Sequence, residues 1–135
     1  MGGYNRSIVA TNEGDRRGAR PGDGWLSNVT VKAYTNDANN TLTPADILGG
    51  VVTSAGKTAN RTLILPLAAD MAAAVPNMDV GESLMFQVAS IDGFSATITT
   101  NTGWTVSGNA IITTLTAKEI IVRRTGAATF DAICL

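Results

Sequence analysis

Short β-prone runs separated by turn residues constrain the fold of this chain more than any other feature of its sequence. From Ser27 onward, runs rich in Val, Ile and Thr alternate with turns that contain Gly, Asn or Asp. The turns recur about every eight to twelve residues, a spacing typical of β-sandwiches and barrels. We therefore predict an all-β, single-domain antiparallel β-sandwich, jelly-roll-like, at residues 26–135, preceded by an extended N-terminal arm at residues 1–25.

The pair Asp92-Gly93 gives the strongest turn signal in the chain. It lies between two β-prone runs, Ser83–Ile91 and Phe94–Thr100. Asp-Gly favours type I′ turns because both central residues of such a turn have positive φ. The two runs are therefore predicted to form an antiparallel hairpin.

Two short helices are expected among the strands. Thr43 can cap a turn that begins at Pro44, because proline suits the first helical position, and Gly49 and Gly50 are expected to end it. After Pro66, apolar residues recur at helical spacing until Pro76. This second segment is predicted to be a short amphipathic helix that covers one end of the β core.

The first 24 residues differ in composition from the rest of the chain. They contain six glycines, and their four basic and three acidic residues give a net charge of +1, whereas residues 25–135 carry six basic and eight acidic residues, or −2. Such a segment cannot by itself bury enough apolar area to offset the entropy lost on ordering. We interpret it as an arm that becomes ordered against a partner, with a flexible tail as the alternative.

The composition excludes several classes of function. The chain has no histidine, which removes the commonest general base and the usual zinc ligand sets, and Cys134 is its single cysteine. A net charge of −1 provides no overall field for nucleic acid or an anionic membrane, and no apolar run approaches the roughly 20 residues of a membrane helix. The start of the chain is polar, so no secretory signal is expected. We predict no enzyme activity, cofactor, metal, nucleic acid or membrane.

A short motif at Gly56-Lys57-Thr58 resembles the end of a phosphate-binding loop. That loop requires a glycine five positions before Gly56, where this chain has Val51. It should also open a helix, yet the residues that follow are predicted to form a strand. A turn between strands is the favoured interpretation.

Charged residues near strand ends leave two further alternatives open. Asp79, Glu82 and Asp92 could supply the pair of carboxylates that glycoside cleavage needs, although acids in solvated turns are ordinary. Arg123 and Arg124 could contact a phosphate or a partner carboxylate, with a solvated strand end as the alternative.

Aromatic residues could also form a platform on which a sugar stacks. The candidates are Trp25, Phe94 and Trp104. Scattered among strands, such residues more often pack in a core or at a sheet edge, and we favour that interpretation.

Four short motifs follow one another in the C-terminal two thirds of the chain. They are LTPADILGGVV (42–52), NRTLILP (60–66), VGESLMF (80–86) and TGWTVSGNA (102–110). In order and spacing this series resembles one in β-rich virion surface proteins of tailed bacteriophages and large algal viruses, and the resemblance covers about residues 41–135. It implies a capsid decoration or cement protein, or else a receptor- or glycan-binding fibre module. Such proteins are usually homo-oligomers and commonly trimers.

On this resemblance we expect a structural virion protein, made in the host cytoplasm, that cements the capsid surface of a bacteriophage. Its partner would be the major capsid protein, and charged residues make up only 16% of the chain, so burial in an assembly would relieve a sparsely charged surface. Arginines of the arm would meet shell carboxylates across joins between subunits, and apolar strand faces would close the oligomer. The candidates for contact with the capsid are Arg6, Arg16, Arg17, Arg20 and Trp25.

Overall fold

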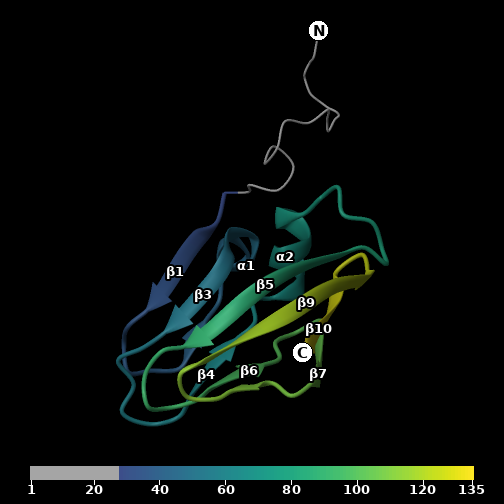
Figure 1. The fold of residues 1–135 in the computed structure, drawn as a ribbon. Coiled ribbons are helices and arrows are strands. Elements are labelled where there is room, and N and C mark those ends of the chain that lie inside the picture. Colours follow the sequence, from purple (N-terminus) through teal and green to yellow (C-terminus); the bar gives the residue numbers. More distant parts are fainter. Residues whose placement is uncertain (1–27) are drawn as a thin grey trace, which may run out of the picture.

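The computed structural model describes residues 28–135, which form ten strands and two short helices (Figure 1). The strands are β1 (Thr30–Tyr34), β2 (Asn40–Thr41), β3 (Gly50–Ser54), β4 (Arg61–Ile64), β5 (Ser83–Ser90), β6 (Ala96–Thr99), β7 (Trp104–Gly108), β8 (Ile111–Ile112), β9 (Thr116–Gly126) and β10 (Thr129–Cys134). The helices are α1 (Pro44–Gly49) and α2 (Ala68–Ala74).

The strands form two mixed sheets, which we name sheet A and sheet B. Sheet A has six strands in the order β1-β3-β5-β9-β10-β7, and sheet B has four in the order β2-β4-β6-β8. Strands β1, β3 and β5 are parallel, as are β2, β4 and β6, and β10 is parallel to β7. The predicted antiparallel, jelly-roll-like sandwich is therefore wrong, although a mostly β fold with two short helices is present.

The route of the chain explains why so many pairs are parallel. From β1 to β8, successive strands alternate between sheet A and sheet B, and helices α1 and α2 connect sheet B back to sheet A. Both helices lie at the end of the molecule opposite the β5–β6 turn (Figure 1). Each return of this kind lets the next strand run in the same direction as the previous one in its sheet, because parallel pairing requires a crossover connection. The first half of the chain is thus wound in stacked coils.

The turns that carry the chain from sheet A to sheet B, here called corners, are joined by side-chain hydrogen bonds. The side-chain oxygen of Asn39 accepts a hydrogen bond from the backbone N–H of Thr62, at 3.0 Å. One coil further on, Asn60 accepts in the same way from the N–H of Ser95, also at 3.0 Å. These bonds connect each corner to the following coil, so the parallel stacking continues beyond the strands.

The hairpin predicted at Asp92-Gly93 does not form. Strand β5 belongs to sheet A and β6 to sheet B, so the turn between them is a corner that changes sheets. Gly93 is not among the positive-φ glycines of the described chain, which a type I′ turn would require. The carboxylate of Asp92 instead accepts hydrogen bonds from the N–H groups of Phe94 and Lys57, and these bonds fix the corner.

Helix α1 begins and ends where its residues predict. Thr43 and Asp46 form a capping box, in which each side chain accepts a hydrogen bond from the other residue's backbone N–H. Pro44 stands at the first helical position, and Gly50 ends the helix with φ of 99°. The predicted second helix is also present, as α2.

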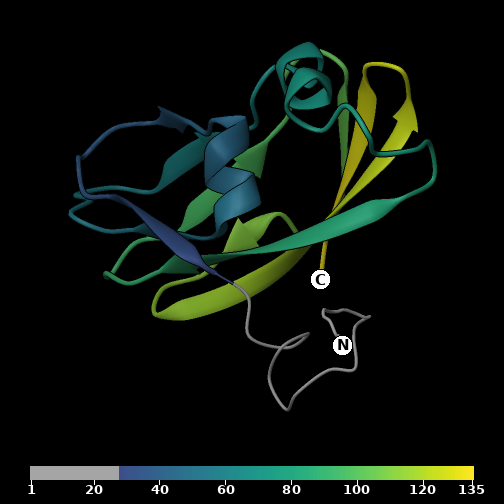
Figure 2. The same ribbon diagram turned by 90° about the horizontal axis from the view of Figure 1, so that it is seen from above.

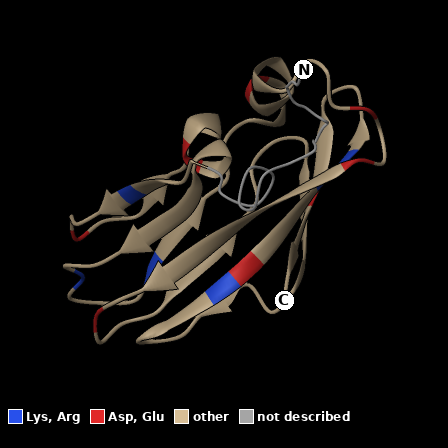
Figure 3. Ribbon diagram, turned by 45° about the horizontal axis from the view of Figure 1, so that its top comes forward, with Lys and Arg blue, Asp and Glu red and all other residues tan. Residues whose placement is uncertain are grey.

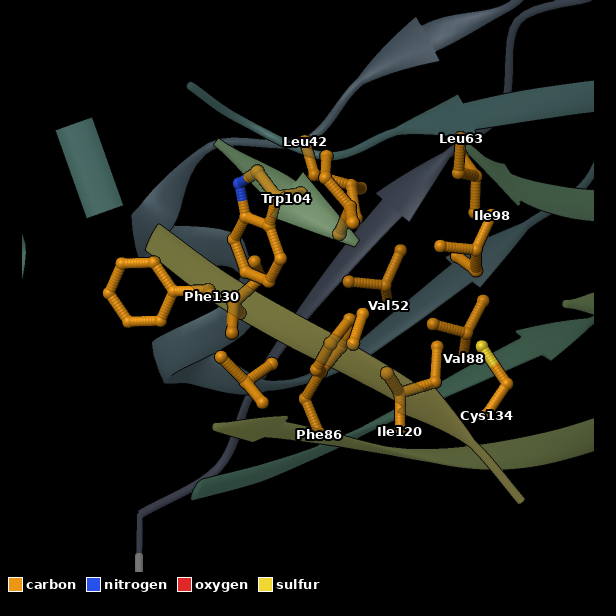
Figure 4. Packing of buried hydrophobic residues seen from close by; sticks show 14 of the residues in the cluster. Leu42, Val52, Leu63, Phe86, Val88, Ile98, Trp104, Ile120, Phe130 and Cys134 are labelled. Atoms are coloured by element: carbon orange, nitrogen blue, oxygen red, sulfur yellow. The ribbon is translucent and has the colours of Figure 1, made fainter. Parts of the chain in front are cut away.

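The core fills the space between the two sheets (Figures 2 and 4). Phe86 and Val88 enter it from β5, and Ile98 enters it from β6. At one end, the rings of Trp104 and Phe130 stack with centroids 5.2 Å apart. All five side chains are at most 6% exposed, so the core reaches across both sheets.

Candidate functional site

The residues predicted to contact a capsid lie outside the described part of the chain. Arg6, Arg16, Arg17, Arg20 and Trp25 all precede Asn28, where the description begins. The same holds for the proposed arm at residues 1–25. Their role stays a prediction.

Lys57, in the motif that resembles a phosphate-binding loop, is buried in the body. Its ammonium lies 2.8 Å from a carboxylate oxygen of Asp92 and donates to the hydroxyl oxygens of Ser54 and Ser90. The side chain of Lys57 is only 1% exposed. Lys57 therefore links the corner between β3 and β4 to the corner between β5 and β6. Its buried ammonium is not accessible to a phosphate in solution.

A second ion pair joins the corner between β1 and β2 to the start of β4. The Nε of Arg61 lies 2.9 Å from Asp37, whose carboxylate also accepts hydrogen bonds from the hydroxyl and the backbone N–H of Thr58. The hydrogen bond from Arg61, together with those from Thr58, holds the pKa of Asp37 well below its usual range. A hydrogen bond from the Lys57 side chain lowers the pKa of Asp92 in the same direction.

The three carboxylates considered for glycoside cleavage do not form a group. Asp79 and Glu82 precede β5 and bond to one another through the N–H of Asp79, which donates to the carboxylate of Glu82 at 2.8 Å. Asp92 follows β5, which has eight residues and so spans roughly 26 Å at 3.3 Å per residue. Paired carboxylates of a glycosidase lie about 5–10 Å apart, so these three cannot act together.

Of the aromatic residues considered as a sugar platform, Trp104 packs in the interior of the body. Trp104 is 6% exposed, and its indole N–H donates to the carbonyl of Pro66 at 2.6 Å. Phe94 is 36% exposed and lies in the corner after β5, while Trp25 is outside the described residues. Because Trp104 is buried, it cannot serve as a sugar platform.

Arg124 ties the loop between α2 and β5 to the hairpin of β9 and β10. Its guanidinium donates to the carbonyls of Val75 and Met78 at 3.2 and 2.6 Å, and to those of Gly126 and Ala127 at 3.1 and 2.5 Å. Four neutral acceptors thus surround one cation, an arrangement that the planar fork of arginine allows. The neighbouring side chain of Arg123 is exposed.

A hollow of the described body opens beside the loop between α2 and β5. It has a volume of about 710 Å³, within the usual range of ligand pockets. Its lining residues are Ala74, Val75, Pro76, Asn77, Met78, Gly81, Glu82, Ser83 and Leu84. Glu82 has the one ionisable side chain among them, so several polar groups do not converge here as they do in a catalytic site.

Within residues 28–135, no three His, Cys, Asp or Glu side chains are placed together as metal ligands. Burial raises the pKa of the Cys134 thiol, which disfavours the reactive thiolate. None of the helices described here has the length and apolar character needed to span a membrane.

One face of sheet A remains as the candidate functional surface. Among the described elements, sheet B and both helices lie on the other side of this sheet (Figure 2). Strand register places Met85, Ile121 and Ile133 side by side on β5, β9 and β10, and Val31 beside Val51 on β1 and β3. On β3, β5, β9 and β10 these residues alternate with residues that face the core, whereas the neighbours of Val31 on the edge strand β1 are exposed. We call this side of sheet A the outer face.

The outer face carries several large apolar side chains among polar ones, and few charges. Val31 and Met85 are 55% and 52% exposed, which is high for large apolar side chains within strands. On β9, the exposed residues Glu119 and Arg123 flank Ile121 at a distance of two positions on either side. Figure 3 shows that charged residues occupy only short parts of the strands of this sheet. A surface of this kind is typical of interfaces between proteins.

Comparison of the whole chain with protein-family models, with curated proteins and with solved structures gave no match. The resemblance to virion surface proteins therefore stays a prediction. It has no support from these comparisons and is not contradicted by them.

The sequence predicted that apolar strand faces close an oligomer, but it did not identify the outer face of sheet A as one of them. Its signal was the run Ile120-Ile121-Val122, which is apolar on both faces of one strand. A half-buried strand of an antiparallel sandwich should instead alternate apolar and polar residues. The run therefore could have indicated a second apolar surface.

Proposed function

We propose that this chain is a structural protein of a virion, which decorates the outer surface of a capsid and stabilises joins between major capsid subunits. The resemblance of residues 41–135 to virion surface proteins is the source of the proposal. The body would provide a rigid oligomeric platform, and the arm would make contact with the shell. Area buried at each join would favour the assembled state by mass action.

One observation in the body carries the proposal. Several of its charged groups connect loops of the body to one another. Lys57 pairs with Asp92, and Arg61 pairs with Asp37. Arg124 binds four backbone carbonyls. An active site needs such groups directed into a cleft, where their pKa values can be tuned for reaction. Here they fix the corners and one end of the body, as expected for a part that carries load.

A fibre module that binds a glycan is the less favoured alternative. It would need several exposed aromatic rings at a tip of the molecule. Trp104 is buried against Phe130, and Phe94 is 36% exposed. A glycan array probed with the full chain tests this alternative directly. Strong and selective binding to one glycan would favour the fibre module over the decoration protein.

Co-sedimentation with intact capsids of the virus that encodes the chain tests the main proposal. We expect the purified full chain to sediment with capsids at a fixed ratio to the major capsid protein. Deleting residues 2–24 should reduce that occupancy, because the arm holds the predicted contacts. Replacing Leu48 by Ser, on the exposed side of α1, is the control and should leave occupancy unchanged. A full chain that stays in the supernatant would refute the proposal.

A further inference from the structure

The outer face of sheet A is large enough to be an interface. Six strands about 4.8 Å apart, each contributing roughly five residues at 3.3 Å, give a projected area of about 480 Å². Protruding side chains make the accessible area larger than this projection. A standard interface buries about 800 Å² on each partner, and smaller ones occur in weaker complexes. The face thus has the size of a modest protein–protein contact.

The charged residues on β9 can pair with the same residues of a second copy of the chain. On β9, Glu119 and Arg123 stand at equal distances on either side of Ile121, and all three face outward. A second copy can be placed with its outer face against that of the first. The two-fold axis that relates the two copies then lies between their sheets A, crosses the strands and passes over Ile121. The axis reverses the direction of β9, so Glu119 of each copy faces Arg123 of the other.

The row of residues under this axis continues from β9 onto the neighbouring strands β5 and β10. Met85 and Ile133 are in register with Ile121, so the row through the axis is apolar. Asp131 is in register with Arg123, so the axis brings no charged residue of β10 opposite it, and its carboxylate instead accepts a hydrogen bond from the hydroxyl of Thr105 on β7. Apolar side chains at the centre and opposite charges on both sides are the usual anatomy of an interface.

We propose that two copies of this chain pair through the outer faces of their sheets A, as an isologous dimer with β9 antiparallel to β9 of its partner. An isologous contact uses the same patch on both copies, and the pair of Glu119 and Arg123 on β9 is self-complementary in charge. That property favours a second copy as the occupant, because in this orientation each copy presents both of the charges that pair with those of the other. The dimer differs from the trimer that the resemblance implies, and it does not depend on attachment to a capsid.

Charge reversal on β9 tests this pairing with the full chain in solution, in the absence of capsids. Sedimentation equilibrium of the unaltered chain should give about twice the 13.9 kDa of one chain. The substitution E119R brings two arginines together at each of the two symmetry-related contacts, and R123E brings two glutamates together in the same way. Each variant alone should weaken dimerisation at least about tenfold, because like charges then face each other.

The two variants should restore dimerisation when they are mixed. In the mixed pair, the arginine introduced by E119R faces the glutamate introduced by R123E. At the other contact, the unaltered Arg123 of the first chain faces the unaltered Glu119 of the second, so both contacts become attractive. No arrangement that leaves β9 outside the interface predicts this rescue. Circular dichroism and thermal unfolding of each variant verify that the fold is retained.

A matched pair of apolar substitutions separates this face from others. Met85→Ser on the outer face should weaken the dimer, whereas Leu48→Ser on α1, at 46% exposure against 52% for Met85, should not. Monomers at all concentrations, a trimer, or a dimer that neither charge reversal affects would overturn the pairing. These outcomes leave the capsid proposal untouched, because that is measured separately by co-sedimentation.

Discussion

Lys57 and Asp92 form a buried ion pair that joins two consecutive corners of the fold, with 2.8 Å between ammonium nitrogen and carboxylate oxygen. The two residues are 35 positions apart in the sequence. The backbone N–H of Lys57 also donates to Asp92, so one carboxylate binds both ends of the same lysine. Removing the carboxylate leaves a buried cation, whereas removing the lysine leaves a carboxylate that solvent can reach.

Asp92→Ala should therefore destabilise the protein more than Lys57→Met. Replacing a buried charge by an apolar side chain of similar length is often nearly neutral, while leaving a buried charge unpaired is costly. We expect the thermal midpoint of D92A to fall several degrees below that of K57M. The double variant should regain part of the loss, because it no longer buries a lone cation. Thermal unfolding followed by circular dichroism measures all three, and equal midpoints for the two single variants would contradict the assignment.

Stability should decrease as the pH falls through about 4, the usual range of aspartate. Asp37 and Asp92 have folded-state pKa values below their unfolded values, because Arg61 and Lys57 stabilise the ionised carboxylates. Above this range both states are ionised and the full contribution is present. Below it the unfolded chain binds protons first, so stability is lost.

Urea unfolding between pH 2 and pH 7 measures this dependence. Asp37→Asn keeps a carbonyl acceptor but cannot ionise, so its profile should be flatter than that of the unaltered chain. Added salt should also reduce the slope, because Asp37 is accessible to solvent. If the pH dependence of stability is the same for D37N as for the unaltered chain, then Asp37 does not cause it.

Three glycines should respond differently to alanine. Gly103 has φ of +88°, and an added Cβ would lie 2.5 Å from the Cβ of Ala68 and 2.9 Å from the carbonyl of Ala128. Gly81 has φ of +94° but open space around it, and Gly93 has open space without a positive φ. Urea unfolding should show almost no loss for G93A, about 1–2 kcal/mol for G81A, and more than that for G103A. A G103A variant as stable as G93A would show that Ala68 and the β9–β10 turn can move apart.

Arg124→Met should release the loop between α2 and β5. Methionine keeps part of the apolar stem but loses the hydrogen bonds to four carbonyls, which should cost about 2 kcal/mol. Hydrogen exchange should become faster at Met78, whose carbonyl is held by the guanidinium, and in the residues around it. Arg123→Met, on the exposed neighbour, is the control and should leave exchange in this loop unchanged. Equal exchange in both variants would contradict the role of Arg124.

Local signals in the sequence predicted local structure well. Thr43, Pro44 and Gly50 mark the ends of α1, because capping and proline geometry depend on residues only a few positions apart. The β-prone runs correctly indicated strands such as β1. The Asp92-Gly93 turn misled because the carboxylate of Asp92 bonds to Lys57, a partner that no local pattern identifies.

The amino-acid sequence by itself determined that this chain forms short strands, two small helices and an apolar core, since these follow from the spacing of apolar, turn and capping residues. Tertiary structure decided that the strands stack in parallel coils and that an apolar face bearing Ile121, Glu119 and Arg123 is turned outward. The physical reason is that strand direction and the choice of exposed face depend on which distant segments pair. Short-range periodicity gives the same signal for either arrangement.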